Sequence, residues 1–96
     1  MKIYMFQKTE ENVNDYDYEF YTDEELFYKY EDAIKYFKEA YESYIDYIDK
    51  NYCLEGEIVD DVCEITRHSE DYYTIYMEAI FYTSFKIHEK TIMSFN

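Results

Sequence analysis

The sequence predicts an α+β domain in which an antiparallel sheet of about four to five strands packs against one long helix, in ββαβββ order. Three observations predict this fold. Apolar residues alternate with a period of two near the N-terminus, recur every three or four residues in the middle, and fall in segments rich in β-branched and aromatic residues toward the C-terminus. Because 96 residues suffice for one hydrophobic core but not for two, residues 1–96 are predicted to form a single acidic domain.

The first two elements are predicted to be strands that pair as a hairpin. Residues 2–9 (KIYMFQKT) alternate in the manner of a strand, and residues 10–15 (EENVND) have the Asn and Asp content of a turn. In residues 15–20, three carboxylates alternate with three aromatic rings. As a strand, this segment would place the acids on one face and the rings on the other.

The long helix is the most strongly indicated element. The sequence TDEE at residues 22–25 has the form of a capping box, with Thr22 as the N-cap and Glu25 three residues later. No helix breaker follows before Asn51, so we predict a helix of about 28 residues. Its predicted core-facing residues are Leu26, Phe27, Tyr30, Ala33, Ile34, Phe37, Ala40, Tyr41, Tyr44, Ile45 and Ile48.

The remaining elements are predicted to complete the sheet. They are a loop at 51–61 and strands at 62–67, 72–87 and 91–95. The loop surrounds Gly56, and a turn at 88–90 precedes the last strand. A helix over 70–82 is the alternative for part of the long strand, but its Tyr, Thr and Ile content favours a strand.

Negative charge is concentrated in the first two-thirds of the chain. The net charge is −14, and residues 10–64 hold nineteen of the twenty-three acids but only four lysines. Solubility alone requires a much smaller imbalance, and self-repulsion on this scale opposes folding. The acid excess therefore indicates a surface that binds a positively charged partner.

The composition also restricts the class of protein. A hydrophobic content of 48% argues against disorder, and no apolar run reaches the length of about 20 residues that spans a bilayer. The N-terminus lacks the features of a signal peptide, so we expect a cytoplasmic protein. In that compartment Cys53 and Cys63 are expected to be free thiols, with a disulfide between them as the alternative.

The sequence offers little for catalysis or metal binding. The two cysteines, with His68 and His88, lack the short ligand spacings of zinc sites. A single glycine rules out a glycine-rich phosphate loop, and no nucleophile motif is present. We therefore expect no enzyme activity, no metal and no cofactor.

An acidic surface can act by imitating nucleic acid. The chain itself would repel a polyanion, so direct nucleic-acid binding is not expected. Acids two apart on a strand, or three or four apart on a helix, lie about 5 to 7 Å from one another, which approaches the spacing of phosphates along a strand. Exposed tyrosines add contact area for a partner. The predicted partner-binding residues are Asp15, Asp17, Glu19, Glu25, Tyr28, Asp32, Glu39, Glu42, Asp46 and Asp49.

The chain is short and acidic, its composition is typical of AT-rich codons, and it contains runs such as TDEELFYKYEDA. In these features it resembles small phage-encoded anti-defence proteins, among them acidic anti-CRISPR proteins that mimic DNA. The resemblance covers residues 14–64 and concerns their character rather than a motif. It implies an inhibitor in the cytoplasm of the host cell that blocks the basic nucleic-acid-binding groove of a CRISPR effector nuclease.

Two other functions fit the same sequence. An immunity protein or antitoxin would also use charge complementarity to neutralise a basic nuclease. A scaffold or regulatory protein would instead pair a sheet edge with a partner, or with a second copy to form a homodimer.

Overall fold

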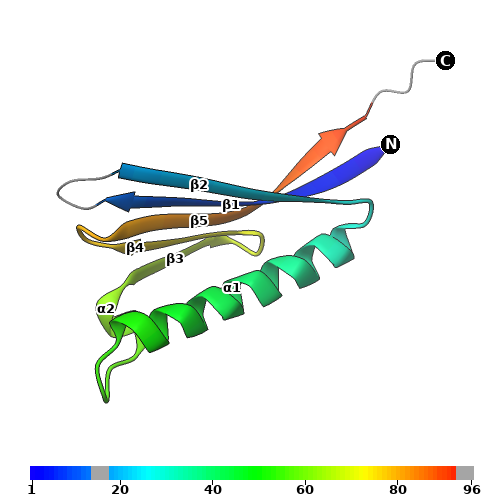
Figure 1. Cartoon of the computed structure of the whole chain (residues 1–96). Coiled ribbons are helices and arrows are strands. Elements are labelled where there is room, and N and C mark those ends of the chain that lie inside the picture. Colours follow the sequence, from blue (N-terminus) through cyan, green and yellow to red (C-terminus); the bar gives the residue numbers. More distant parts are fainter. Residues whose placement is uncertain (14–17, 93–96) are drawn as a thin grey trace.

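A five-stranded antiparallel sheet packs on one long helix, which confirms the predicted fold class and element order (Figure 1). The computed structural model describes residues 1–13 and 18–92. The elements are β1 (Lys2–Val13), β2 (Tyr18–Phe27), α1 (Tyr30–Tyr52), α2 (Val59–Val62), β3 (Glu64–Ser69), β4 (Tyr72–Met77) and β5 (Phe81–Thr91).

The first and last strands pair in the interior of the sheet. The strand order is β2-β1-β5-β4-β3, and every neighbouring pair is antiparallel. β1 and β2 form the predicted hairpin, and β1 pairs on its other side with β5 over nearly its whole length. β2 and β3 are therefore the two edge strands.

The core lies between α1 and one face of the sheet. α1 contributes Ala33, Phe37, Tyr44 and Ile48 to it, four of the residues that the three- and four-residue periodicity predicts. From the sheet, the rings of Phe6 and Phe85 pack against the ring of Phe37, with centroids 6.1 and 6.3 Å away. The strand period of two brings these side chains to the same face, so the helix and the sheet bury each other's apolar residues.

The opposite face of the sheet is uncovered. Both helices lie on the same side of the sheet (Figure 1). The side chains of β5 accordingly alternate between buried residues, such as Phe85 and Ile87, and residues that are at least partly exposed. This alternation is typical of an antiparallel sheet with one face toward a core and one toward water.

The predicted start of the helix at Thr22 is wrong. β2 continues through Phe27, and α1 begins at Tyr30 after Lys29, which makes no side-chain cap hydrogen bond. Residues 22–27 pair instead with β1, from Thr22 opposite Thr9 to Phe27 opposite Tyr4. A helix cap is worth only about 1 kcal/mol, so a six-residue ladder of backbone hydrogen bonds outweighs it.

This correction shortens the helix and changes the hairpin. α1 has 23 residues rather than 28 and ends at Tyr52, close to the predicted Asn51. Leu26 is exposed on β2 rather than buried under the helix. Residues 10–13, predicted as a turn, belong to β1, whereas 14 and 15 lie outside the described residues.

The C-terminal third also differs from its predicted boundaries. The segment 72–87 is not one strand but two, β4 and β5, and the alternative helix over 70–82 is wrong. β5 continues through the predicted turn at 88–90 because these residues pair with β1. The predicted last strand at 91–95 is therefore not separate, since Thr91 ends β5 and residues 93–95 lie outside the described range.

Candidate partner-binding groove

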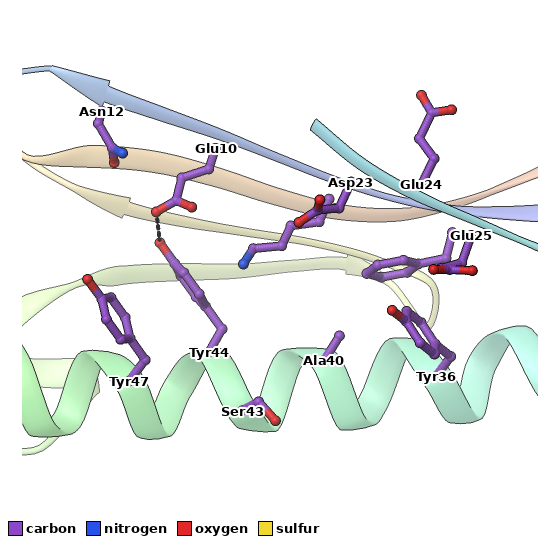
Figure 2. Close-up of a pocket in the computed structure, with 12 residues that line it drawn as sticks. Glu10, Asn12, Asp23, Glu24, Glu25, Tyr36, Ala40, Ser43, Tyr44 and Tyr47 are labelled. Atoms are coloured by element: carbon purple, nitrogen blue, oxygen red, sulfur yellow. Dashed lines mark hydrogen bonds between the residues drawn. The ribbon is translucent and has the colours of Figure 1, made fainter. Parts of the chain in front are cut away.

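A groove of about 750 Å³ runs between the β1–β2 hairpin and α1, beside the core (Figure 2). Its sheet-side wall carries carboxylates, and its helix-side wall carries tyrosines and small residues. We call it the acidic groove; it is lined by Phe6, Lys8, Glu10, Asn12, Asp23, Glu24, Glu25, Tyr36, Ala40, Ser43, Tyr44 and Tyr47.

Strand alternation places the carboxylates of the groove. In the hairpin, Asp23 lies opposite Lys8 and Glu25 opposite Phe6, so these residues share the face that looks toward α1. Glu24, between them in sequence, projects to the other side of β2 (Figure 2). Glu10 projects toward α1 from β1, so three carboxylates point to the helix-facing side.

Tyr36 and Tyr47 line the helix-side wall. The ring of Tyr36 packs against the rings of Phe6 and Phe27, with centroids 5.0 and 5.4 Å away. The ring of Tyr47 stacks on Tyr44 at 6.0 Å. Because core rings hold them in place, these tyrosines present a preorganised apolar surface with hydroxyl groups.

Tyr44 connects this wall to the core. Its hydroxyl donates to Glu10 Oε1 at 3.1 Å and lies 2.8 Å from the hydroxyl of Thr83, which is fully buried. Burial raises the pKa of Tyr44 well above its usual range; the hydrogen bond with Thr83 lowers this pKa, and the nearby Glu10 carboxylate raises it further. The phenol therefore stays protonated at neutral pH and fixes the Glu10 carboxylate at the groove wall.

Lys8 is the one basic residue in the lining of the groove. Its Nζ lies 4.4 Å from the centroid of the Tyr44 ring, within the range of a cation–π contact. Among the described residues, the one side-chain ion pair within 4.0 Å joins Lys2 to Glu89, which do not line the groove. The groove carboxylates thus have no salt-bridge partner within the described part of the chain.

The ten predicted partner-binding residues do not form one surface. Asp15 and Asp17 lie outside the described residues. Glu25 lines the acidic groove, but from β2 rather than from the helix. Glu19 lies farther along β2, where its Oε2 accepts a hydrogen bond from the hydroxyl of Tyr21 at 2.8 Å. The side chain of Tyr28, which is 77% exposed, lies in the connection between β2 and α1.

The other five lie on α1 and are all exposed. They are Asp32, Glu39, Glu42, Asp46 and Asp49. The acid excess on α1 is smaller than on the predicted helix, because Asp23, Glu24 and Glu25 belong to β2, whereas Lys35, Lys38 and Lys50 remain on α1. Glu42, Asp46 and Asp49 also line a second groove of about 550 Å³ on another flank of α1, which includes Arg67.

The sequence argument did not identify Lys8, Glu10, Asp23 or Tyr44 as residues of a site. The sequence predicts a turn at Glu10 and a helix cap that includes Asp23. The helix cap is predicted because the acids of TDEE fit a capping box as well as a strand. No local pattern identifies Asp23 as a strand residue, because the alternation of acids and rings stops at Phe20 and residues 22–25 (TDEE) are all polar. Tyr44 was predicted correctly as a core residue, but its contact with Glu10 depends on tertiary packing.

The remaining chemical features of the chain are few. Cys53 and Cys63 are free thiols, and burial raises the pKa of both. Within residues 1–13 and 18–92, no group of three or more His, Cys, Asp and Glu side chains is placed to hold a metal ion. Over the same residues, no helix has the length and apolar character needed to cross a membrane.

Comparison of the chain with protein-family models, with curated protein sequences and with solved structures finds no match. The geometry and charge of the chain itself are therefore the basis on which we infer its function.

Proposed function

We propose that this protein is an inhibitor that binds a basic segment of a nucleic-acid-binding enzyme, and that the acidic groove is its binding site. The observation that carries the proposal is the arrangement of Glu10, Asp23 and Glu25 along one wall of a groove whose other wall is made of tyrosines. No described ion pair within 4.0 Å neutralises these three carboxylates.

The two walls suit the two parts of an arginine or lysine side chain. The aliphatic stem of such a side chain covers apolar surface while its charged head stays among polar groups. Rings at Tyr36 and Tyr47 offer that surface, and the carboxylates opposite would accept hydrogen bonds from the head group. Lys8 provides an internal example, because its ammonium group already lies over the Tyr44 ring.

The target class follows from charge and from the resemblance to anti-defence proteins. An enzyme that grips nucleic acid carries a groove lined with lysine and arginine. A partner with net charge −14 is attracted to that groove by the same long-range field that attracts DNA. We propose a bacterial defence nuclease, such as a CRISPR effector, as the target.

The position of the site is tested by charge reversal at matched positions. The groove variant is Asp23→Lys with Glu25→Lys, and the control is Asp32→Lys with Glu39→Lys on the outer face of α1; both change the net charge by the same amount. Binding of a fluorescent oligo-arginine peptide is measured by anisotropy. We expect the groove variant to lose affinity by about tenfold or more and the control by about twofold or less.

The function is tested by adding the protein to DNA-cleavage reactions of CRISPR effector nucleases and of bacterial toxin nucleases. Inhibition of an effector that is lost in the groove variant supports the proposal. Inhibition of toxin nucleases alone would favour an immunity protein instead. If the groove variant binds the peptide and inhibits as well as the parent, the acidic groove is not the active surface and the proposal is wrong.

A further inference from the structure

The uncovered side of the sheet lies opposite the side that carries the acidic groove, and Glu24 on the edge strand β2 is the one residue that the two surfaces share. We call it the open face. Its residues are Phe20, Thr22, Glu24 and Leu26 of β2, Ile3, Met5, Gln7, Thr9 and Glu11 of β1, Tyr82, Ser84, Lys86, His88 and Lys90 of β5, Tyr72, Thr74 and Tyr76 of β4, and Glu64, Thr66 and His68 of β3.

A row of short hydroxyl side chains crosses the whole open face. The strand registers place Thr22, Thr9, Ser84, Thr74 and Thr66 next to one another on the five successive strands. Short side chains in the middle of a sheet leave a flat surface that a second layer can approach closely. We call these five residues the hydroxyl row.

Several polar groups in the middle of the open face are already hydrogen-bonded within the chain. The hydroxyls of Thr9 and Ser84 bond to each other, and Nε2 of His68 bonds to the hydroxyl of Thr74 at 2.9 Å. Gln7 bonds Glu24 on one side and His88 on the other, both at 3.0 Å. Covering groups that keep their partners costs far less than covering unpaired ones, so the face can be buried.

The open face carries almost none of the net charge. It has three carboxylates, at Glu11, Glu24 and Glu64, and two ammonium groups, at Lys86 and Lys90, so it contributes one unit of the total of −14. It also exposes large apolar side chains, with Phe20 at 53% and Leu26 at 64% of their full exposure. For two copies of so acidic a chain, this is the surface of least mutual repulsion.

The size of the open face fits a weak dimer. Four inter-strand steps of about 4.8 Å and an average of about six residue steps of about 3.4 Å give roughly 400 Å² per copy, or about 800 Å² for two copies, which is the size of a weak, transient interface. We infer that two copies of the chain associate through their open faces, sheet on sheet, as a homodimer with a dissociation constant in the micromolar range.

The residues on either side of the hydroxyl row determine how the two copies are oriented in the dimer. A two-fold axis along the row would bring each residue that lies two positions from the row opposite its counterpart on the other side of the row, four positions away on the same strand of the second copy. Lys86 then faces Tyr82 of the second copy, Tyr72 faces Tyr76, and Glu11 faces Gln7. These pairs place a cation over an aromatic ring and a carboxylate beside an amide, so the face is complementary to itself.

Sedimentation equilibrium across a range of concentrations tests the dimer. The face variant is Tyr76→Glu with Tyr82→Glu. The matched control is Tyr28→Glu with Tyr47→Glu, two residues that lie outside the open face. All four rings are exposed, and circular dichroism checks that both variants fold. We expect the face variant to raise the dimer dissociation constant at least tenfold and the control to change it little. The wild-type dimer should persist at high salt, unlike binding to the acidic groove.

Cross-linking tests the orientation. In the proposed dimer, Ser84 lies at the centre of the interface, so Ser84→Cys treated with a short bis-maleimide should give a dimer linked through residue 84 of both copies. The same change at Ser43, which lines the acidic groove, should not. If the wild-type chain is a monomer at every concentration, the inference is wrong. It is also wrong if the face variant still forms the dimer, because the contact would then lie at a sheet edge or on another surface.

Discussion

At the residue scale, Tyr44 joins the buried core to the acidic groove through a single hydroxyl. The phenol has one proton, and the geometry directs it to Glu10, so the hydroxyl of Thr83 donates to the Tyr44 oxygen. At the other end of α1, the hydroxyl of Tyr30 shares its one proton between Oε1 of Glu70 and Oδ2 of Asp71, at 3.1 and 3.2 Å. Both phenols are placed where a negative charge would be unfavourable.

These two tyrosines predict sensitivity to alkaline pH. Burial, and then the neighbouring carboxylates, raise the pKa of Tyr30; burial is also the main cause of the raised pKa of Tyr44. A group whose pKa is higher in the folded state stabilises the fold fully below its unfolded pKa, about 10 for tyrosine, and less as pH rises beyond it. We therefore expect the free energy of unfolding to fall steadily above about pH 10.

Urea denaturation at a series of pH values measures this loss, and Tyr44→Phe provides the comparison. The variant should be less stable by about 1 to 2 kcal/mol at neutral pH, because Thr83 and Glu10 lose a hydrogen-bond partner. Above about pH 10 its stability should fall less steeply than that of the parent, because one buried phenol no longer ionises. Equal slopes for the two proteins would show that Tyr44 is not the titrating group.

At the element scale, the turn between β4 and β5 explains why the sequence predicted one strand where there are two. Residues 78–80 contain neither glycine, asparagine nor proline, the residues that usually mark a turn. Ala79 nevertheless has φ of 64°, in the left-handed region that is unfavourable for residues with a Cβ atom. The pairing of β4 with β5 holds this residue in a strained conformation.

Relief of that strain gives a stability prediction. Ala79→Gly should raise the free energy of unfolding by roughly 0.5 to 1 kcal/mol, because glycine adopts positive φ readily and this outweighs its greater freedom in the unfolded chain. The control is Ala33→Gly in α1, which should lower stability by about 1 kcal/mol or more. Thermal and urea denaturation measure both changes, and a destabilised Ala79→Gly protein would contradict the strain.

The sequence was informative where periodicity and burial agree. The apolar period of α1, the N-terminal hairpin and the β content of the last third were sufficient for the fold class and for most of the core. They were insufficient where local and tertiary preferences compete, as at Thr22, where strand pairing with Thr9 prevails over a helix cap. The groove depends on that boundary, since Asp23 and Glu25 face α1 only if they belong to β2.

At the scale of the whole molecule, the chain is elongated. Its radius of gyration is 15.6 Å, whereas a compact domain of this length has about 12.5 Å. A single helical layer over a five-stranded sheet buries one face and leaves the other in solvent, so the surface is large for the size of the core. The acid excess lies on the part of this surface outside the open face, which contributes one unit of the total of −14.

The net charge predicts that salt stabilises the fold. At −14, repulsion among the acids opposes the compact state. Raising the ionic strength from about 0.01 to about 0.15 M shortens the screening length from about 30 to about 8 Å, which weakens this repulsion. We expect the midpoint of thermal unfolding to rise with NaCl, as measured by circular dichroism, and a fall would show that attractive charge pairs dominate.

The pairing of β1 with β5 also has a consequence for the order of folding. The interior of the sheet is formed by the first and last strands of the described chain, with Phe6 opposite Ile87. During synthesis the hairpin and α1 emerge early, but β1 keeps an unpaired edge until β5 leaves the ribosome. Completion of the sheet thus awaits the synthesis of β5, and contacts so distant in sequence make that step slow.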